Sequence, residues 1–216
     1  MRRLVGLWQG ERGLADVVGG QHAATIAKLR QAGDNTGMEV RHADANKRLD
    51  QFVDAAFAFA VTLLVIAAAD PPANLPELRA ALLNIPASAA AFLFIVMFWN
   101  HHRAFARLTP MRDGISTMLS LMIVFTVLVY VFPLKLLAQS LFYWISRGAL
   151  PGEGLINSWG DLANLYQIYG LGFFALSGLY ALLFMRSAHL APEAERAEPA
   201  RYRDAWAVCA GTGLVS

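Results

Sequence analysis

The sequence has few charged residues and a single cysteine. Of its 216 residues, 16% are charged and 56% are hydrophobic, whereas soluble domains average about 25% and 45–50%. This balance indicates that lipid is the solvent for much of the chain. The lone Cys209 excludes an intrachain disulfide framework and argues against a thiolate metal cluster. The net charge of +2, with no basic stripe, gives no reason to expect nucleic-acid binding.

What the sequence does contain is four long stretches without charge. They are Ala55–Ala69, Ala80–His102, Gly114–Leu134 and Leu162–Met185. The last three reach the roughly 20 residues that a helix needs to cross about 30 Å of hydrocarbon. The first can also span if Phe52 and Val53 extend it and Asp54 faces protein or water. We therefore predict an all-α, polytopic membrane helix bundle with four full transmembrane helices.

The distribution of Lys and Arg predicts an orientation. Fifteen of them lie before the first stretch, between the second and third, or after the fourth, and only three lie in the other two connections. This positive-inside pattern predicts a multi-pass protein of the cell membrane with its N-terminus in the cytoplasm. No signal peptide is expected, because no apolar core of sufficient length precedes Glu11.

The ends of the chain differ from its centre. Residues 1–46 mix Gly, Ala and charge, and predict a cytoplasmic extension that is partly helical around Ala23–Arg30. Residues 47–190 form the predicted transmembrane domain. In residues 191–216, a polar linker at 191–204 precedes "AWAVCAGTGLVS", which is typical of the start of a fifth apolar helix. Twelve residues cannot span a membrane.

One seam of large apolar residues follows the first stretch. Phe52, Ala56, Phe59, Leu63 and Ile66 recur at spacings of four and three, which places them along one side of a helix. The periodicity alone favours a helix–helix packing face over a pore-lining face. The neighbouring Leu64 is expected to face lipid.

Polar residues gather where the first two stretches reach the same side of the membrane. Arg48 and Asp54 are six positions apart, too far for a pair within one helix, so Asp54 is expected to find a partner on another helix. The segment "FWNHHRAF" offers Trp99, Asn100, His101 and His102. Adjacent histidines point about 100° apart on a helix and do not easily share one ion, so we expect no bound metal and no cofactor.

The stretch from Arg48 to Asp54, "RLDQFVD", resembles the R-x-x-x-F-S-D signature that opens the first helix of the transmembrane protein 175 family of potassium channels. The "AFAFAVTLLVI" run that follows is typical of that family. "FWNHHRAFARL" resembles the end of its second helix, and residues 118–137, with Pro133, its third. The likeness extends to about residue 186.

Three positions depart from the family pattern. Val53 replaces the signature serine, Ser120 replaces an asparagine, and a shifted Trp–His spacing makes His101 and His102 compete for the family's histidine position. Prokaryotic members have six spans and assemble as tetramers around the first helix, so this chain is expected to stop inside its fifth.

The resemblance implies a potassium-permeable channel, a homotetramer in the lipid bilayer. Phe59, Leu63 and Ile66 would form an apolar constriction, and Thr62 would contribute to selectivity. A network of Arg48, Phe52, Asp54, Trp99, His101, His102 and Ser120 would hold the first helix in place. The sequence contains no T-V-G-Y-G filter.

Other function classes stay open. A non-conducting structural or assembly subunit is the main alternative. A secondary transporter is less favoured, because Pro86 and Pro133 are expected near span ends and no charge is expected at mid-membrane. An enzyme is not expected, because the polar cluster has no evident nucleophile.

Overall fold

The computed structural model describes residues 43–66, 72–110, 112–152 and 159–215, together with Lys28, Gln31, Met38, Val40 and Arg41. The chain divides into two compact units, Met1–Ala45 and Asn46–Ser216. The second unit contains the helix bundle. The helix predicted around Ala23–Arg30 lies outside the described residues, apart from Lys28.

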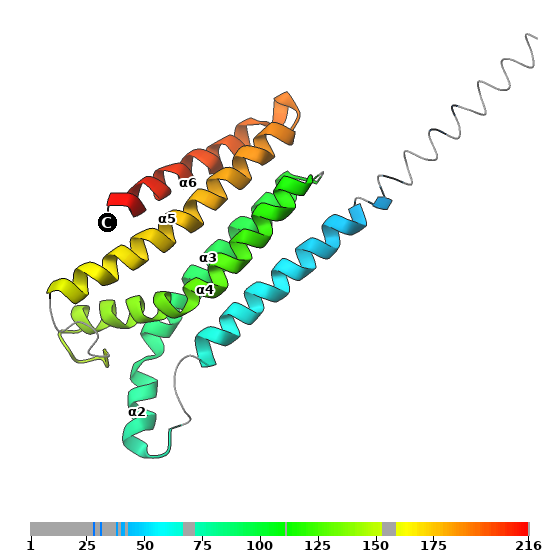
Figure 1. Ribbon diagram of the computed structural model, residues 1–216. Helices are drawn as coiled ribbons and strands as arrows, with labels where there is room; N and C mark the ends of the chain where they lie inside the picture. The colour runs from blue at the N-terminus through cyan, green and yellow to red at the C-terminus, as the bar shows by residue number, and fades with distance from the viewer. Residues whose placement is uncertain are drawn as a thin grey trace, which may run out of the picture. The chain divides into compact units, whose positions relative to one another are not determined.

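Over the described residues the second unit is built of helices and has no strand, so the predicted all-α fold is confirmed (Figure 1). It contains residues 46–66 of an N-terminal helix (Ala43–Ile66), α2 (Leu75–Leu83), α3 (Ile85–Leu108), α4 (Gly114–Ile145), α5 (Trp159–Leu190), the short η1 (Glu193–Glu195) and α6 (Ala197–Val215). Three of these are long and apolar enough to cross a membrane: the N-terminal helix, α4, and α5 from Ala163. α2 and α3 reach the same length and hydropathy only as a pair, bent by 41° at the break between them, so the described residues contain three candidate spans, or four if this pair is one span.

Proline and polar caps set where the helices begin and end. Asn74 accepts the N–H of Glu77 and starts α2. The bend between α2 and α3 falls at Asn84, two residues before Pro86, which has no N–H to donate to the carbonyl of Leu82 and whose ring would clash with that carbonyl in a continuous helix. Asp113 caps α4 by accepting the backbone N–H of Ser116.

α4 continues past its predicted end, and this corrects two expectations. Because it reaches Ile145, Pro133 lies inside the helix rather than near the end of a span. Lys135, expected in a connection, is likewise inside α4, where its side chain is 4% exposed and has an interaction partner. A basic residue therefore lies within a helix that is long and apolar enough to cross a membrane.

α6 begins earlier than predicted. The helix starts at Ala197, so much of the polar segment assigned to a linker forms its first two turns. α6 packs along α5, and the two run side by side in Figure 1. Gly213 allows this approach, because a Cβ there would lie 2.9 Å from the backbone N of Phe174.

The face by which the N-terminal helix packs on its own subunit is not the predicted seam. Val53, Phe57, Ala60 and Leu64 are all buried in the core. Leu64 is only 2% exposed, so the expectation that it faces lipid is wrong. Within the predicted seam, Phe52, Phe59 and Ile66 are exposed and lie on average about 130° around the helix from the buried residues, whereas Ala56 and Leu63 are partly buried against the core.

Candidate functional site

A salt bridge ties the N-terminal helix to the loop between α3 and α4. Both terminal nitrogens of Arg112 donate to the two carboxylate oxygens of Asp50, at 2.6 and 3.0 Å. Arg112 also donates to the carbonyls of Thr109 and Ala106, and its side chain is only 2% exposed. Such a two-pronged pair holds both position and orientation.

One turn along the helix, Asp54 binds α3. The indole N–H of Trp99 donates to the Asp54 carboxylate at 2.7 Å. The guanidinium of Arg103 lies 4.9 Å from the centre of the Trp99 ring, in a cation–π contact. Asp54 thus has a partner on another helix, Trp99.

The two adjacent histidines have different surroundings. His102 is 2% exposed, and its Nε2 lies 3.0 Å from the hydroxyl of Ser120 on α4. His101 is turned instead toward α5 and α6, where its ring meets those of Tyr180, Tyr202 and Trp206 edge-on. Of the two histidines, His102 is therefore the one that joins α3 to α4.

The loop before α4 is also tied to α5. Arg186 donates to Asp113 from Nε at 2.9 Å and from Nη2 at 2.5 Å. This guanidinium holds the pKa of the Asp113 carboxyl well below its usual range. The hydroxyls of Thr109 and Ser187 share a 2.6 Å hydrogen bond beside it.

Two residues of the predicted network make no polar or buried contact among the described residues of the chain. Arg48 is exposed and forms no hydrogen bond or ion pair with any residue that the structure describes. Phe52 is 55% exposed. Both lie on the uncovered side of the N-terminal helix, and the contacts from this helix to its neighbours are made by Asp54, a residue of the predicted network, and by Asp50, which was not in it.

The predicted constriction residues lie on that uncovered side. Phe59 is 55% and Ile66 67% exposed, and Leu63 is partly buried at its edge. Thr62 is exposed, and its hydroxyl donates to the carbonyl of Ala58 at 3.1 Å. The hydroxyl proton is therefore used within the helix, which leaves the oxygen's lone pairs free to accept from outside.

The sequence reasoning missed Arg112, Asp113 and Arg186 as site residues. The available signal was their position: Arg112 and Asp113 are adjacent charges in a short connection between two spans, and Arg186 is the first charge after the fourth apolar stretch. Charges at span ends are usually solvated, so nothing in the sequence pairs Asp113 with Arg186.

Long apolar helices, buried cores between them and polar ties near their ends define a multi-pass α-helical membrane protein. Comparison with known proteins agrees with this class and points to one family within it. The family described as "Endosomal/lysosomal potassium channel TMEM175" matches residues 48–133. The resemblance predicted from the sequence is therefore confirmed.

Two relatives extend beyond that segment. A protein named "Potassium channel" from Marivirga tractuosa is 31% identical over 147 residues, which are 65% of this chain and 58% of the relative. The chain thus spans a little over half the length of this curated relative. The crystal structure of a variant of the potassium channel MtTMEM175, in complex with a nanobody–MBP fusion protein, superposes with a TM-score of 0.69 at 25% identity. That match covers 78% of this chain and 76% of the other.

Proposed function

We propose that the protein is a potassium-permeable cation channel whose pore is lined by the N-terminal helix. The main support for this proposal is that the N-terminal helix has two different faces. One face, including Phe57 and Leu64, is buried in the subunit, and the opposite face, including Phe59 and Ile66, is left uncovered. The relative named a potassium channel and the superposed potassium channel structure support the ion.

Phe59, Leu63 and Ile66 form the proposed constriction. They follow one another at spacings of four and three, so they stack along one side of the helix at successive turns. Rings of such side chains around an axis resist wetting and stop hydrated ions until the helices move apart. The polar ties at Asp50 and Asp54 support this role, because they restrict rotation of the helix.

Thr62 is the proposed selectivity residue. It lies beside Phe59 on the uncovered face, and its donor is satisfied by Ala58. Its oxygen can therefore act as an acceptor toward a partly dehydrated cation. A ring of such oxygens would select by ligand number and spacing rather than by a filter of backbone carbonyls.

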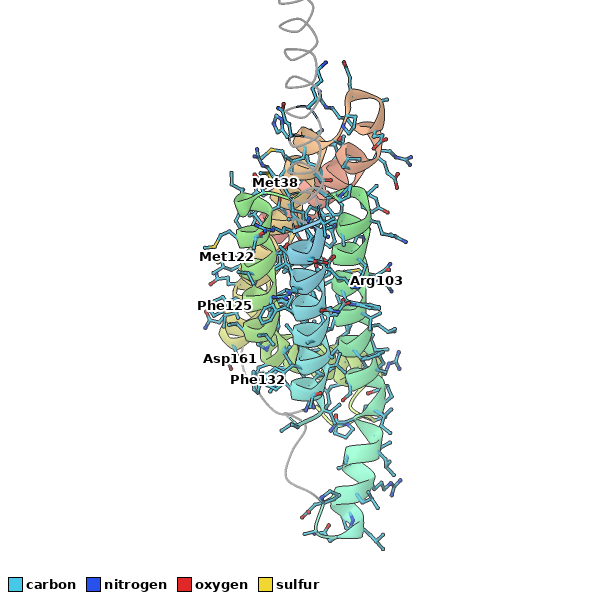
Figure 2. All side chains as sticks on the ribbon, turned by 90° about the vertical axis from the view of Figure 1, so that its right-hand side faces the viewer. Met38, Arg103, Met122, Phe125, Phe132 and Asp161 are labelled. Atoms are coloured by element: carbon cyan, nitrogen blue, oxygen red, sulfur yellow. The ribbon has the colours of Figure 1, made fainter. Side chains whose placement is uncertain are left out.

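A pore built from one helix per subunit needs several copies, and we propose a homotetramer in the cell membrane with a cytoplasmic N-terminus. An uncovered apolar stripe on α4 supports such assembly. In Figure 2, Met122, Phe125 and Phe132 lie along the outer edge of α4, beside the N-terminal helix. Their exposed fractions are 40%, 62% and 54%.

Flux from liposomes tests the proposal. Proteoliposomes that contain the purified protein and are loaded with potassium should release potassium faster than protein-free liposomes. Native mass measurement of the protein in detergent should give a complex of four subunits. Correctly inserted tetramers without flux would indicate a structural subunit. Monomers alone would contradict the pore itself.

A further inference from the structure

A large groove lies between α3 and α6, with α5 beneath it, outside the proposed pore. Its volume is about 830 Å³. α6 lines it with one side of the helix, from Glu198 through Arg201 and Ala205 to Cys209. α3 supplies Phe94, Met97 and His101, and α5 supplies Phe173.

The groove is polar at one end only. Glu198, Arg201 and His101 lie toward the end where α6 begins, whereas Phe94, Phe173 and Cys209 line the rest. Glu198 and Cys209 are eleven residues apart, which is ~16 Å along a helix. This is about half of the ~30 Å hydrocarbon thickness, the depth of one leaflet. The chemistry of the groove thus changes along its length as a phospholipid does.

Aromatic side chains stack behind the inner wall of the groove. Trp206 stacks on Tyr180 at 4.9 Å and on Phe98 at 5.7 Å between ring centres. The Tyr180 hydroxyl donates to the carbonyl of Phe98 at 2.7 Å. An acyl chain would therefore meet a preformed apolar surface rather than one that must be ordered on binding.

The charges at the polar end carry both signs. Glu198 and Arg201 are exposed and three residues apart on α6, yet neither forms an ion pair with another described residue. A phosphate would pair with Arg201 and an ammonium with Glu198. A head group that contains both charges, a few bonds apart, matches this arrangement better than an anionic one.

We propose that this groove binds one phospholipid of the ethanolamine type, with its phosphate at Arg201, its ammonium at Glu198 and one acyl chain along Phe94, Met97 and Phe173. The lipid would lie in the leaflet on the side where α6 begins. The proposed lipid site does not depend on ion conduction, so a result on lipid binding leaves the proposed channel function untouched.

Lipid titration of the delipidated full chain in detergent tests this, with bound lipids counted by native mass spectrometry. The probes are phosphatidylethanolamine and phosphatidylglycerol with the same acyl chains. The wild type should bind one phosphatidylethanolamine more tightly than phosphatidylglycerol. Arg201→Gln should weaken both by about tenfold, and Glu198→Gln should weaken only phosphatidylethanolamine.

Matched variants on the two sides of α6 test whether the lipid binds in this groove. Ala205→Trp should fill the groove and abolish the single tight site, with Ala205→Leu as a milder version. Ala207→Trp, on the opposite side of α6, and Arg203→Gln, whose side chain pairs with Asp204, should leave binding unchanged. Equal effects of Ala205→Trp and Ala207→Trp would overturn the site. Equal binding of both lipids, unchanged by Glu198→Gln, would overturn the ethanolamine assignment.

Discussion

Trp99 donates its indole N–H to the carboxylate of Asp54, and this 2.7 Å bond joins α3 to the N-terminal helix. Asp54 lies on the flank of the helix, between the buried face of Phe57 and the uncovered face of Phe59. The bond therefore acts on the rotation of the helix as well as on its attachment. In the proposed channel, that rotation decides which side chains face the pore.

The Trp99 bond can be tested by removing either partner. Asp54→Ala should lower the free energy of unfolding by about 1 kcal/mol, because it removes one hydrogen bond at a partly exposed site, and Trp99→Phe should lower it by more, because it also removes part of the ring that packs on the core and faces Arg103. Asp54→Asn keeps an acceptor and should cost less. Denaturant unfolding in detergent measures this, with exposed Gln51→Ala as control. No change in Asp54→Ala would mean that the carboxylate is simply solvated.

Loss of Asp50 should be more damaging. Asp50→Ala leaves the almost fully buried Arg112 without its carboxylate, and we expect a loss of about 2–3 kcal/mol. Arg112→Lys should also lower the free energy of unfolding, because an ammonium group cannot make the two-pronged contact with the Asp50 carboxylate. A double-mutant cycle isolates the coupling between the two residues. A coupling near zero would show that the pair only fills space.

Asp113 should make the stability of the folded protein depend on pH in the acidic range. Because Arg186 lowers its pKa in the folded protein, its contribution is complete above the ordinary aspartate value of about 4 and is lost as the pH falls below it. Asp113→Asn should lower the melting temperature at pH 7 and progressively less toward pH 3. High salt should weaken the effect, because both side chains are about one-third exposed. A constant difference across pH would contradict the assignment.

The proposed constriction predicts different effects of the same substitution on two sides of one helix. Leu63→Asn or Ile66→Asn should make the proposed closure wettable and raise potassium flux. Val65→Asn is the matched control: Val65 is adjacent in depth and 67% exposed, but points about 100° away from Ile66. It should leave flux near the wild-type level. Unchanged or lower flux in both constriction variants, with protein inserted normally, would return the seam to helix packing.

Thr62 tests selectivity separately from closure. Thr62→Val keeps the shape but removes the oxygen, so the potassium-to-sodium permeability ratio should fall severalfold. Thr62→Ser keeps the oxygen and should preserve the ratio. Reversal potentials under mixed-ion conditions measure both. An unchanged ratio in Thr62→Val would remove this residue from the selectivity mechanism.

Much of this protein follows from the sequence alone. The charge-free stretches determine the membrane helices, because an unpaired charge in hydrocarbon is too costly to be common. The motif from Arg48 to Asp54 points to the family that the comparisons also identify. A polar end for the bundle was likewise predictable from the residues around Trp99 and His102, since buried polar groups need partners.

Only the tertiary structure decided which of those residues meet. Asp50 rather than Arg48 ties the helix to the next loop, His102 rather than His101 reaches Ser120, and Asp113 finds Arg186. It also decided that Leu64 is buried while Ile66 is uncovered. In lipid, apolar residues on any side of a helix are equally soluble, so periodicity does not separate an inner face from an outer one. That separation comes from how neighbouring helices pack, which depends on residues far away in the sequence.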